Sequence, residues 1–170
     1  MTRGYLLDTN IVAYWFAADS LEHPRVMDHI QSLPVDSLLF VSAITLGEIE
    51  YGHQSETKGN YITVQMLFNE FVQKKFPKVL EIGNGTATDY GRLRALLFEK
   101  FGGMKGKKRR WPEELTDPST AKSLGIQEND LWIAAQAMEH RLVLVTHDKM
   151  TRIREVACPL LDVEDWTEKG

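Results

Sequence analysis

The chain has 170 residues, 43% of them apolar, which predicts one globular domain over residues 1–170 with its own hydrophobic core. Twenty basic and twenty-four acidic residues give a net charge of −4, so overall charge does not indicate a nucleic-acid-binding protein, and any such function depends on local basic patches. The single cysteine, Cys158, cannot form an internal disulfide, and no apolar run resembles a membrane span or a signal peptide, so we expect a cytoplasmic protein that does not contact the membrane.

The first predicted strand, residues 4–7, leads directly into Asp8, Thr9 and Asn10 and then into a helix over residues 11–16. The apolar run is too short for a helix, and Asp-Thr-Asn is typical of a helix start. Asp8 is therefore expected at the carboxyl end of the strand, where open α/β sheets bind their ligands. The alternative is that Asp8 or Thr9 only caps the helix.

Strand and helix patterns continue to alternate after this unit. Residues 26–33 predict a helix, residues 38–41 a strand, and residues 42–52 a helix that stops at Gly52. The apolar positions of this last helix are Ile44, Ile49 and Tyr51.

Three more elements follow up to residue 97. Residues 61–76 predict an amphipathic helix, with an apolar stripe formed by Ile62, Met66, Phe68, Phe71 and Val72. Residues 79–82 predict a short strand. The next helix has an inner face formed by Ala87, Tyr90, Leu93, Leu96 and Leu97.

Residues 102–127 interrupt the alternation with glycines, prolines and a basic run, and we interpret them as a long loop or insertion. The pattern resumes with a helix that opens at residues 127–130, a strand over residues 142–146 and a last weak strand near residues 159–161. Strands that alternate with helices predict an α/β fold, a parallel sheet with helices on both faces.

Four carboxylates occupy related positions in this predicted fold: Asp8, Glu48, Asp130 and Asp148. The carboxyl ends of parallel strands lie along one edge of a sheet, so at least three of the four are expected to converge there. Apart from Lys149, these segments contain no basic residue to compensate them. Carboxylates held together without a counter-charge repel one another and become protonated unless a cation binds.

Oxygen ligands without His or Cys favour Mg²⁺ or Mn²⁺ over zinc. A pair of such ions about 4 Å apart generates the attacking hydroxide and stabilises the leaving oxygen in many enzymes that cleave phosphodiesters. The acids therefore predict metal-dependent phosphodiester hydrolysis.

Each acid also has a purely structural interpretation. Glu48 could be a solvated helix residue, and Asp130 or its neighbour Asn129 could cap a helix or place a favourable charge in its first turn. Asp148 could stabilise a turn. Their shared position favours the joint site.

The only concentrated basic patch lies in the interrupted stretch and contains Lys105, Lys107, Lys108, Arg109 and Arg110, with Trp111 beside them. Basic side chains neutralise phosphates, and an indole stacks on an unpaired base, so these residues are a predicted RNA contact. The alternative is a solvated loop. Trp15, Trp132 and the phenylalanines are predicted core residues, and Cys158 is predicted to be a packed thiol.

Four motifs in this order resemble those of PIN-domain ribonucleases, particularly the VapC toxins of type II toxin–antitoxin pairs. They are Leu6 to Asn10, Ser42 to Gly52 around Glu48, Asn129-Asp130 before an alanine-rich helix, and Val145 to Asp148. The resemblance covers nearly the whole chain. The basic stretch over residues 102–127 departs from it, because it is longer than expected before the third motif.

The resemblance implies a PIN-like three-layer α/β/α sandwich, Mg²⁺- or Mn²⁺-dependent cleavage of RNA, a homodimer, and a small antitoxin whose C-terminal segment enters the acidic cleft. Asp8, Glu48 and Asp130 would be the core metal-binding acids and Asp148 the more variable fourth. Asn10 and Thr146 would be supporting residues that orient a carboxylate or a water.

Two other functions compete with the toxin hypothesis. A phosphatase that forms an aspartyl-phosphate would also place an acid where Asp8 stands, but such enzymes generally need a second acid two positions later, where this chain has Asn10. A PIN-like module could instead bind RNA or a peptide without turnover. The presence of all four acids favours the enzyme.

Overall fold

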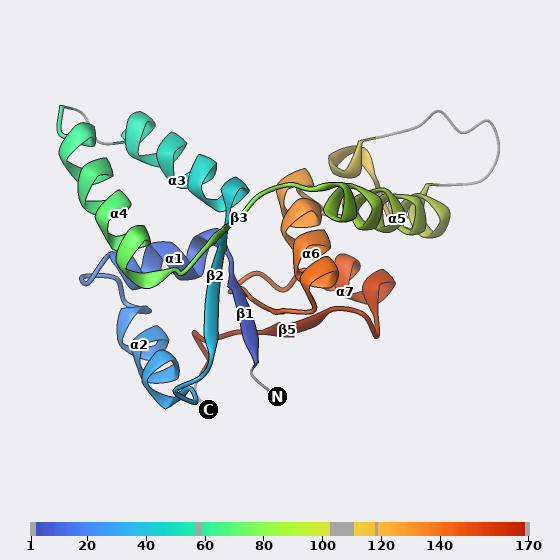
Figure 1. The fold of residues 1–170 in the computed structure, drawn as a ribbon. Helices are drawn as coiled ribbons and strands as arrows, with labels where there is room; N and C mark the ends of the chain where they lie inside the picture. Colours follow the sequence, from blue (N-terminus) through green and yellow to red (C-terminus); the bar gives the residue numbers. More distant parts are fainter. Residues whose placement is uncertain (1–2, 57–58, 103–110, 118, 169–170) are drawn as a thin grey trace.

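The computed structural model describes residues 3–56, 59–102, 111–117 and 119–168. Within them a five-stranded, all-parallel sheet has the strand order β3-β2-β1-β4-β5 (Figure 1). The strands are β1 (Gly4–Leu7), β2 (Leu38–Ser42), β3 (Val79–Leu80), β4 (Val143–Val145) and β5 (Asp162–Glu164).

Helices cover both faces of this sheet. One layer contains α1 (Thr9–Phe16), α2 (His23–Ser32), α3 (Ala43–Glu56) and α4 (Tyr61–Lys75). The other contains α5 (Asn84–Phe101), α6 (Glu128–His140) and α7 (Thr151–Ala157), and a short 3₁₀ helix, η1 (Pro112–Glu114), lies beside α5. The predicted three-layer α/β/α sandwich is therefore confirmed.

The sheet separates two hydrophobic cores because successive residues of a strand point to opposite faces. Leu6 and Leu144 are fully buried among residues of α5, α6 and α7. Their neighbours Leu7 and Val145 are fully buried on the other face, among residues of α1 to α4. Strands buried on both faces explain why each reads as a continuous apolar run.

The strand order reverses beside β1, at the pairing of β1 with β4. From β1 the chain moves outward to β2 and β3, and then returns across the sheet to β4 and β5. Leu7 pairs with Val41 on one side and with Val145 on the other, so the residues that follow β1 and β4 are direct neighbours. Such a reversal point, at the carboxyl ends of the strands, is where open α/β sheets bind ligands.

The predicted boundaries and faces of α3 and α4 were partly wrong. Helix α3 continues through Gly52 to Glu56, and the predicted inner residue Tyr51 is 76% exposed. In α4, Phe68 and Val72 are buried as predicted, but Ile62 and Met66 are more than 60% exposed. The α3–α4 pair extends past the end of the sheet, so no apolar layer covers these positions (Figure 1).

The C-terminal region also differs from the prediction. Helix α7 was not predicted, and the last strand, β5, begins at Asp162, after the predicted residues 159–161. Cys158 is exposed, which corrects its prediction as a packed thiol, because it lies just past the end of α7. Trp15 is buried as predicted, whereas Trp132 is only partly buried and stacks on Tyr90 with ring centroids 3.8 Å apart.

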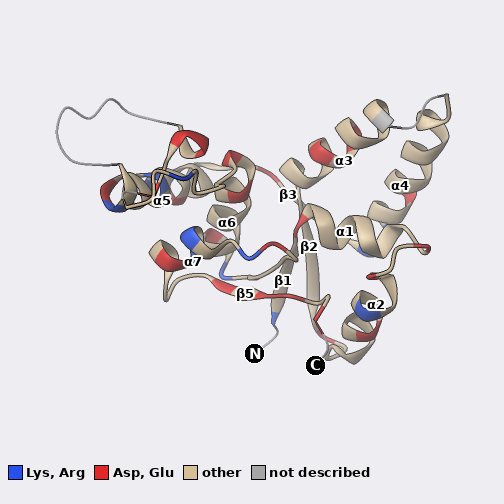
Figure 2. Ribbon diagram, turned by 180° about the vertical axis from the view of Figure 1, so that it is seen from behind, with Lys and Arg blue, Asp and Glu red and all other residues tan. Residues whose placement is uncertain are grey.

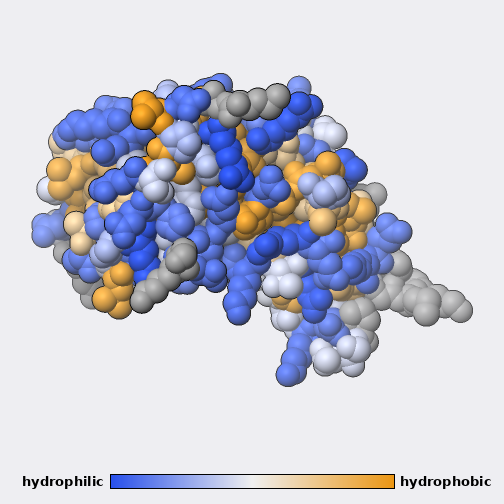
Figure 3. All heavy atoms as spheres, turned by 90° about the horizontal axis from the view of Figure 1, so that it is seen from below, coloured by the Kyte–Doolittle hydropathy of each residue, from blue (hydrophilic) through white to orange (hydrophobic). Residues whose placement is uncertain are grey.

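The predicted loop over residues 102–127 contains some regular structure where it is described. It includes η1 and an isolated antiparallel bridge between Thr116 and Ser123. Across the described chain, no helix has the length and apolar content that a membrane crossing requires. The face seen from below in Figure 3 is mostly hydrophilic and carries separate hydrophobic patches.

Candidate active site

Asp8 lies immediately after β1, at the edge predicted for it, and its side chain is 3% exposed. Its carboxylate accepts hydrogen bonds from the Thr9 backbone N–H at 2.7 Å and from Thr146 Oγ1 at 2.7 Å. Asp8 is also the N-cap of α1. The capping and site interpretations are therefore compatible: the cap fixes one carboxylate oxygen, and the second oxygen faces the end of β4.

Thr146 follows β4 and connects Asp8 to the acidic loop beyond it. Its side chain is 1% exposed, donates to Asp8 and accepts from the backbone N–H of Asp148 at 3.0 Å. Asn10 holds the same loop from α1, because its Nδ2 donates to Asp148 Oδ2 at 2.9 Å and its Oδ1 accepts from the His147 N–H at 3.1 Å. Both residues predicted to support the acids thus contact them.

Glu48 reaches the same region from α3. Its carboxylate accepts a hydrogen bond from Thr9 Oγ1 and another from Asn129 Nδ2 at 2.7 Å. The sequence analysis weighed Thr9 and Asn129 only as caps. Thr9 follows Asp8 in the sequence, and Asn129 precedes Asp130. This adjacency is the sequence signal that could have identified them as site residues.

Asp130 is the third residue of α6, counted from the N-cap Gln127. A backbone hydrogen bond from Gln127 reaches the Asp130 carboxyl and lowers its pKa, as in the carboxylate half of a capping box. The predicted helix-start role of Asp130 is therefore present. Asp130 also lines a pocket of about 510 Å³ together with Asp148, which places it in the acidic region as well.

The electrostatics show that the four acids share one region. Burial raises the pKa of Asp8 to about 6, with smaller contributions from the charges of Glu48 and Asp148 and opposing contributions from the hydrogen bonds of Thr146 and Thr9. Burial likewise raises the pKa of Asp130 to about 7, and the negative charges of Asp8, Asp148 and Glu48 raise it further. The neighbouring negative charges thus destabilise the ionised forms of Asp8 and Asp130.

Within the described ranges, none of the four acids forms an ion pair with a lysine or arginine that would offset this repulsion. Figure 2 shows acidic segments around the upper ends of the strands, between α3 and α6. An uncompensated acidic cluster with buried members is an environment that a cation stabilises.

The donor set suits a hard divalent cation, because all the converging side chains offer oxygen atoms. In the described part of the chain, no group of three or more His, Cys, Asp or Glu side chains is arranged to hold a metal ion. Mg²⁺ commonly keeps several waters and uses one or two carboxylates together with substrate phosphate oxygens. Asp130 and Asp148 line the same pocket and could supply the two carboxylates of such a site.

The predicted RNA-contact residues Lys105, Lys107, Lys108, Arg109 and Arg110 lie outside the described residues. Their neighbour Trp111 is described and is 55% exposed. The Arg94 guanidinium lies 4.6 Å from the centre of the Trp111 ring. One face of this indole is thus already covered by a cation.

The comparisons with known proteins identify the family and the fold of this chain. The family model for the PIN domain matches residues 5–157. The search of curated proteins returned no significant match.

Three solved structures are similar in fold. VapBC2 from Rickettsia felis, bound to a DNA fragment from its promoter, has 24% identity and a TM-score of 0.68, with 96% of this chain and 98% of that chain covered. VapBC-1 from nontypeable Haemophilus influenzae has 24% identity and a TM-score of 0.67, with 97% and 99% covered. FitAcB from Neisseria gonorrhoeae has 20% identity and a TM-score of 0.65, with 97% and 99% covered.

Proposed function

The chain belongs to the PIN domain family, and we propose that it is a Mg²⁺- or Mn²⁺-dependent endoribonuclease, the toxin of a toxin–antitoxin pair. One observation carries the proposal. Asp8 and Asp130, from two distant parts of the chain, both have a raised pKa beside the reversal point of the sheet, and the charge of Asp8 contributes to the shift at Asp130. Acids perturbed by burial and by neighbouring charges are typical of functional sites.

In this proposal Asp8, Glu48, Asp130 and Asp148 are the metal-holding and catalytic acids. A bound divalent cation would neutralise the cluster and stabilise the charge that develops on a phosphodiester during hydrolysis. The protein's own contribution is position: Thr146 and the Thr9 N–H fix the Asp8 carboxylate, and Asn10 fixes Asp148.

Hydrogen bonds to a metal-holding carboxylate set its orientation and basicity. Thr9 and Asn129 serve Glu48 in this way, and both of them neighbour another acid in the sequence. The carboxylates are therefore connected through short polar side chains. We infer that Asn10 and Thr146 are positioning residues.

RNA is the proposed substrate, with the basic residues of 105–110 and Trp111 as proposed contacts to its phosphates and bases. The solved neighbours are VapBC and FitAcB complexes, and this supports a small antitoxin as the partner of this chain. We also propose a homodimer that acts in the cytoplasm, where RNA is accessible.

The test is incubation of the full chain with a mixed pool of structured and single-stranded RNAs, with Mg²⁺, with Mn²⁺ and with a chelator. We expect cleavage only with metal, and a loss of at least a hundredfold in Asp8→Asn and Asp130→Asn. The matched control is Asp28→Asn, an exposed acid of α2 far from the site in sequence. Equal cleavage by all variants would assign the activity to a contaminant.

A PIN-like binding module without turnover remains the second candidate, and one observation favours it. The Glu48 carboxylate already accepts two hydrogen bonds within the protein, so it is less available to a metal. If the protein is such a module, RNA should bind with unchanged affinity in the presence of chelator and should stay intact in Mg²⁺ and Mn²⁺. If it is a ribonuclease, the RNA should be cleaved in Mg²⁺ or Mn²⁺.

A further inference from the structure

A pocket of about 510 Å³ opens beside the acidic cluster. Asp130 and Asp148 line it, and its remaining walls are residues 124–127, which lead into α6, and residues 149–153, which lead into α7. Its volume lies within the range of about 300 to 1,000 Å³ typical of pockets that bind small ligands. A molecule in this pocket would lie next to the proposed catalytic acids.

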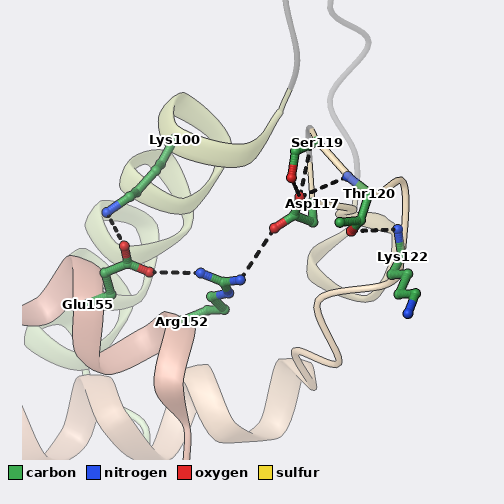
Figure 4. A network of polar contacts seen from close by, with 7 residues as sticks. All are labelled: Lys100, Asp117, Ser119, Thr120, Lys122, Arg152 and Glu155. Carbon is green, nitrogen blue, oxygen red and sulfur yellow. Dashed lines mark hydrogen bonds and ion pairs between the residues drawn. The ribbon is translucent and has the colours of Figure 1, made fainter.

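The wall formed by residues 124–127 belongs to the segment that departs from the resemblance to VapC toxins. This segment is anchored to the rest of the molecule by a polar network (Figure 4). Arg152 pairs with Asp117 at 3.4 Å and with Glu155 at 3.2 Å, and Glu155 pairs with Lys100 of α5 at 2.6 Å. The two walls of the pocket are therefore linked to each other through Arg152.

Asp117 also organises its own turn. Its carboxylate accepts from the backbone N–H groups of Ser119 and Thr120 at 2.9 and 3.0 Å and from the Ser119 hydroxyl at 2.5 Å. These hydrogen bonds lower the pKa of Asp117 to about 2, so it stays ionised and paired with Arg152 at any ordinary pH.

The backbone of both walls adopts left-handed conformations. Gly125 has φ +65°, and Met150, which precedes α7, has φ +42°. A left-handed backbone is uncommon for a residue with a side chain, and such residues cluster at ligand-binding positions. Met150 is buried, which places a flexible thioether in the lining.

The lining has the chemistry that suits an unpaired nucleotide. Ile126 and Met150, which are 4% and 8% exposed, supply a small apolar floor on which a base can rest. The Gln127 side chain is an amide with donors and an acceptor, and Lys149 carries a positive charge. Neither side chain has a hydrogen-bond or ion-pair partner among the described residues, and both residues are exposed.

A second pocket, of about 710 Å³, supports the path of an extended chain. It shares Asp148 and Lys149 with the first pocket, and its lining also includes the basic Arg25 and Arg154 and the acidic Asp165 and Glu168. Asp148 and Lys149 thus form a ridge between two pockets. A single strand laid across the ridge would place one nucleotide on each side of Asp148.

We propose that the pocket between residues 124–127 and 149–153 holds the base of one unpaired RNA nucleotide next to the cleaved phosphate, with Gln127 reading the edge of the base and Lys149 contacting the phosphate. This inference rests on the proposed ribonuclease function. It assigns substrate selectivity to the segment in which this chain departs from the PIN-toxin pattern.

The test is sequencing of the cut sites in a randomised single-stranded RNA pool, with the full chain and Mn²⁺. We expect a preferred base at one position beside the cut. Gln127→Ala should reduce the ratio between the best and worst bases at that position by roughly tenfold, whatever the total rate, because a hydrogen bond to the base is lost. Gln127→Glu should move the preference toward cytosine, whose amino group donates a hydrogen bond to a carboxylate.

The matched control is Gln73→Ala, an exposed glutamine of α4, which should leave the base preference unchanged. An unchanged preference in both Gln127 variants would overturn the inference while leaving the ribonuclease proposal intact.

If the wild-type protein cuts no RNA, the proposed function fails, and the pocket is tested by fluorescence anisotropy with the four homopolymeric RNA pentanucleotides. Binding that discriminates between bases and loses this discrimination in Gln127→Ala supports the pocket. Equal binding of the four pentanucleotides, or no binding, overturns the proposed base pocket and favours a protein segment as its occupant.

Discussion

Thr146 Oγ1 donates a hydrogen bond to the buried carboxylate of Asp8, although 138 residues separate the two along the chain. This bond lowers the pKa of Asp8 against the larger effect of burial. Thr146→Val should raise the pKa of Asp8 further above 6 and shift the pH profile of RNA cleavage toward higher pH. Thr146→Ser retains the hydroxyl and should restore the wild-type profile.

The same variant also tests the stability of the strand ends. Thr146→Val leaves a buried carboxylate oxygen without its donor, which should lower the free energy of unfolding by about 1 to 3 kcal/mol in urea melts. A pH profile that stays in place despite such destabilisation would mean that Thr146 is structural only.

Asp130→Asn should stabilise the fold while removing activity. The pKa of Asp130 is about 7 in the folded protein and 3.8 is its ordinary value, so the folded state binds more protons between these pH values and its stability falls as pH rises through them. At pH 8 the asparagine variant should be more stable by about 1 kcal/mol, after allowance for solvent screening. Urea melts at pH 4 and pH 8 should show the gain only at the higher pH. Asp28→Asn serves as the control.

Divalent cations should stabilise the metal-free protein. A cation that binds only the folded state adds about 2.7 kcal/mol at a concentration one hundred times its dissociation constant, which corresponds to roughly 5 to 10 °C in a chain of this length. Thermal melts with MgCl₂ or MnCl₂ should show a rise in Tm in the wild type and a clearly smaller rise in Asp8→Asn and Asp130→Asn. Equal shifts in all three proteins would place the cation elsewhere.

Arg152→Ala should weaken base selectivity at the position that Gln127 is proposed to read. The substitution removes the ion pair with Asp117, and with it the link between the two walls of the pocket. Arg152→Lys keeps the charge and should restore part of the selectivity. Arg92→Ala, an exposed arginine of α5, is the control, and cut-site sequencing of all three variants is the measurement. Selectivity that survives in Arg152→Ala would show that the walls do not depend on this contact.

Local sequence pattern predicted the elements that are buried on both faces. Strands β1, β2 and β4 are short apolar runs, and this pattern arises because helices cover both sides of a parallel sheet. Helix α7 was missed, since its seven residues bury only Ile153 and Ala157 and show no full amphipathic repeat. The exposure of Ile62 depends on where the sheet ends, which periodicity does not report.

The positions of Asp8, Asp130 and Asp148 were predictable because strand ends and helix starts have recognisable residues, whereas Glu48 was predicted from its place in the helix that follows the second strand. Their hydrogen-bond partners were less predictable, because the Asn129 contact with Glu48 joins positions 81 residues apart and depends on how α6 docks against α3. The pocket walls lay beyond sequence reasoning altogether. The anchoring of the 111–127 segment by Arg152 comes from α7, the helix that the sequence pattern did not predict.

The reversal of strand order beside β1 joins early and late parts of the fold at one edge of the sheet. Asp8 follows β1, whereas Thr146 and Asp148 follow β4, and the hydrogen bond from Thr146 to Asp8 spans 138 positions. A partly folded intermediate in which β4 has not yet paired with β1 therefore lacks the cluster, so assembly of the acids is coupled to the pairing of these two strands.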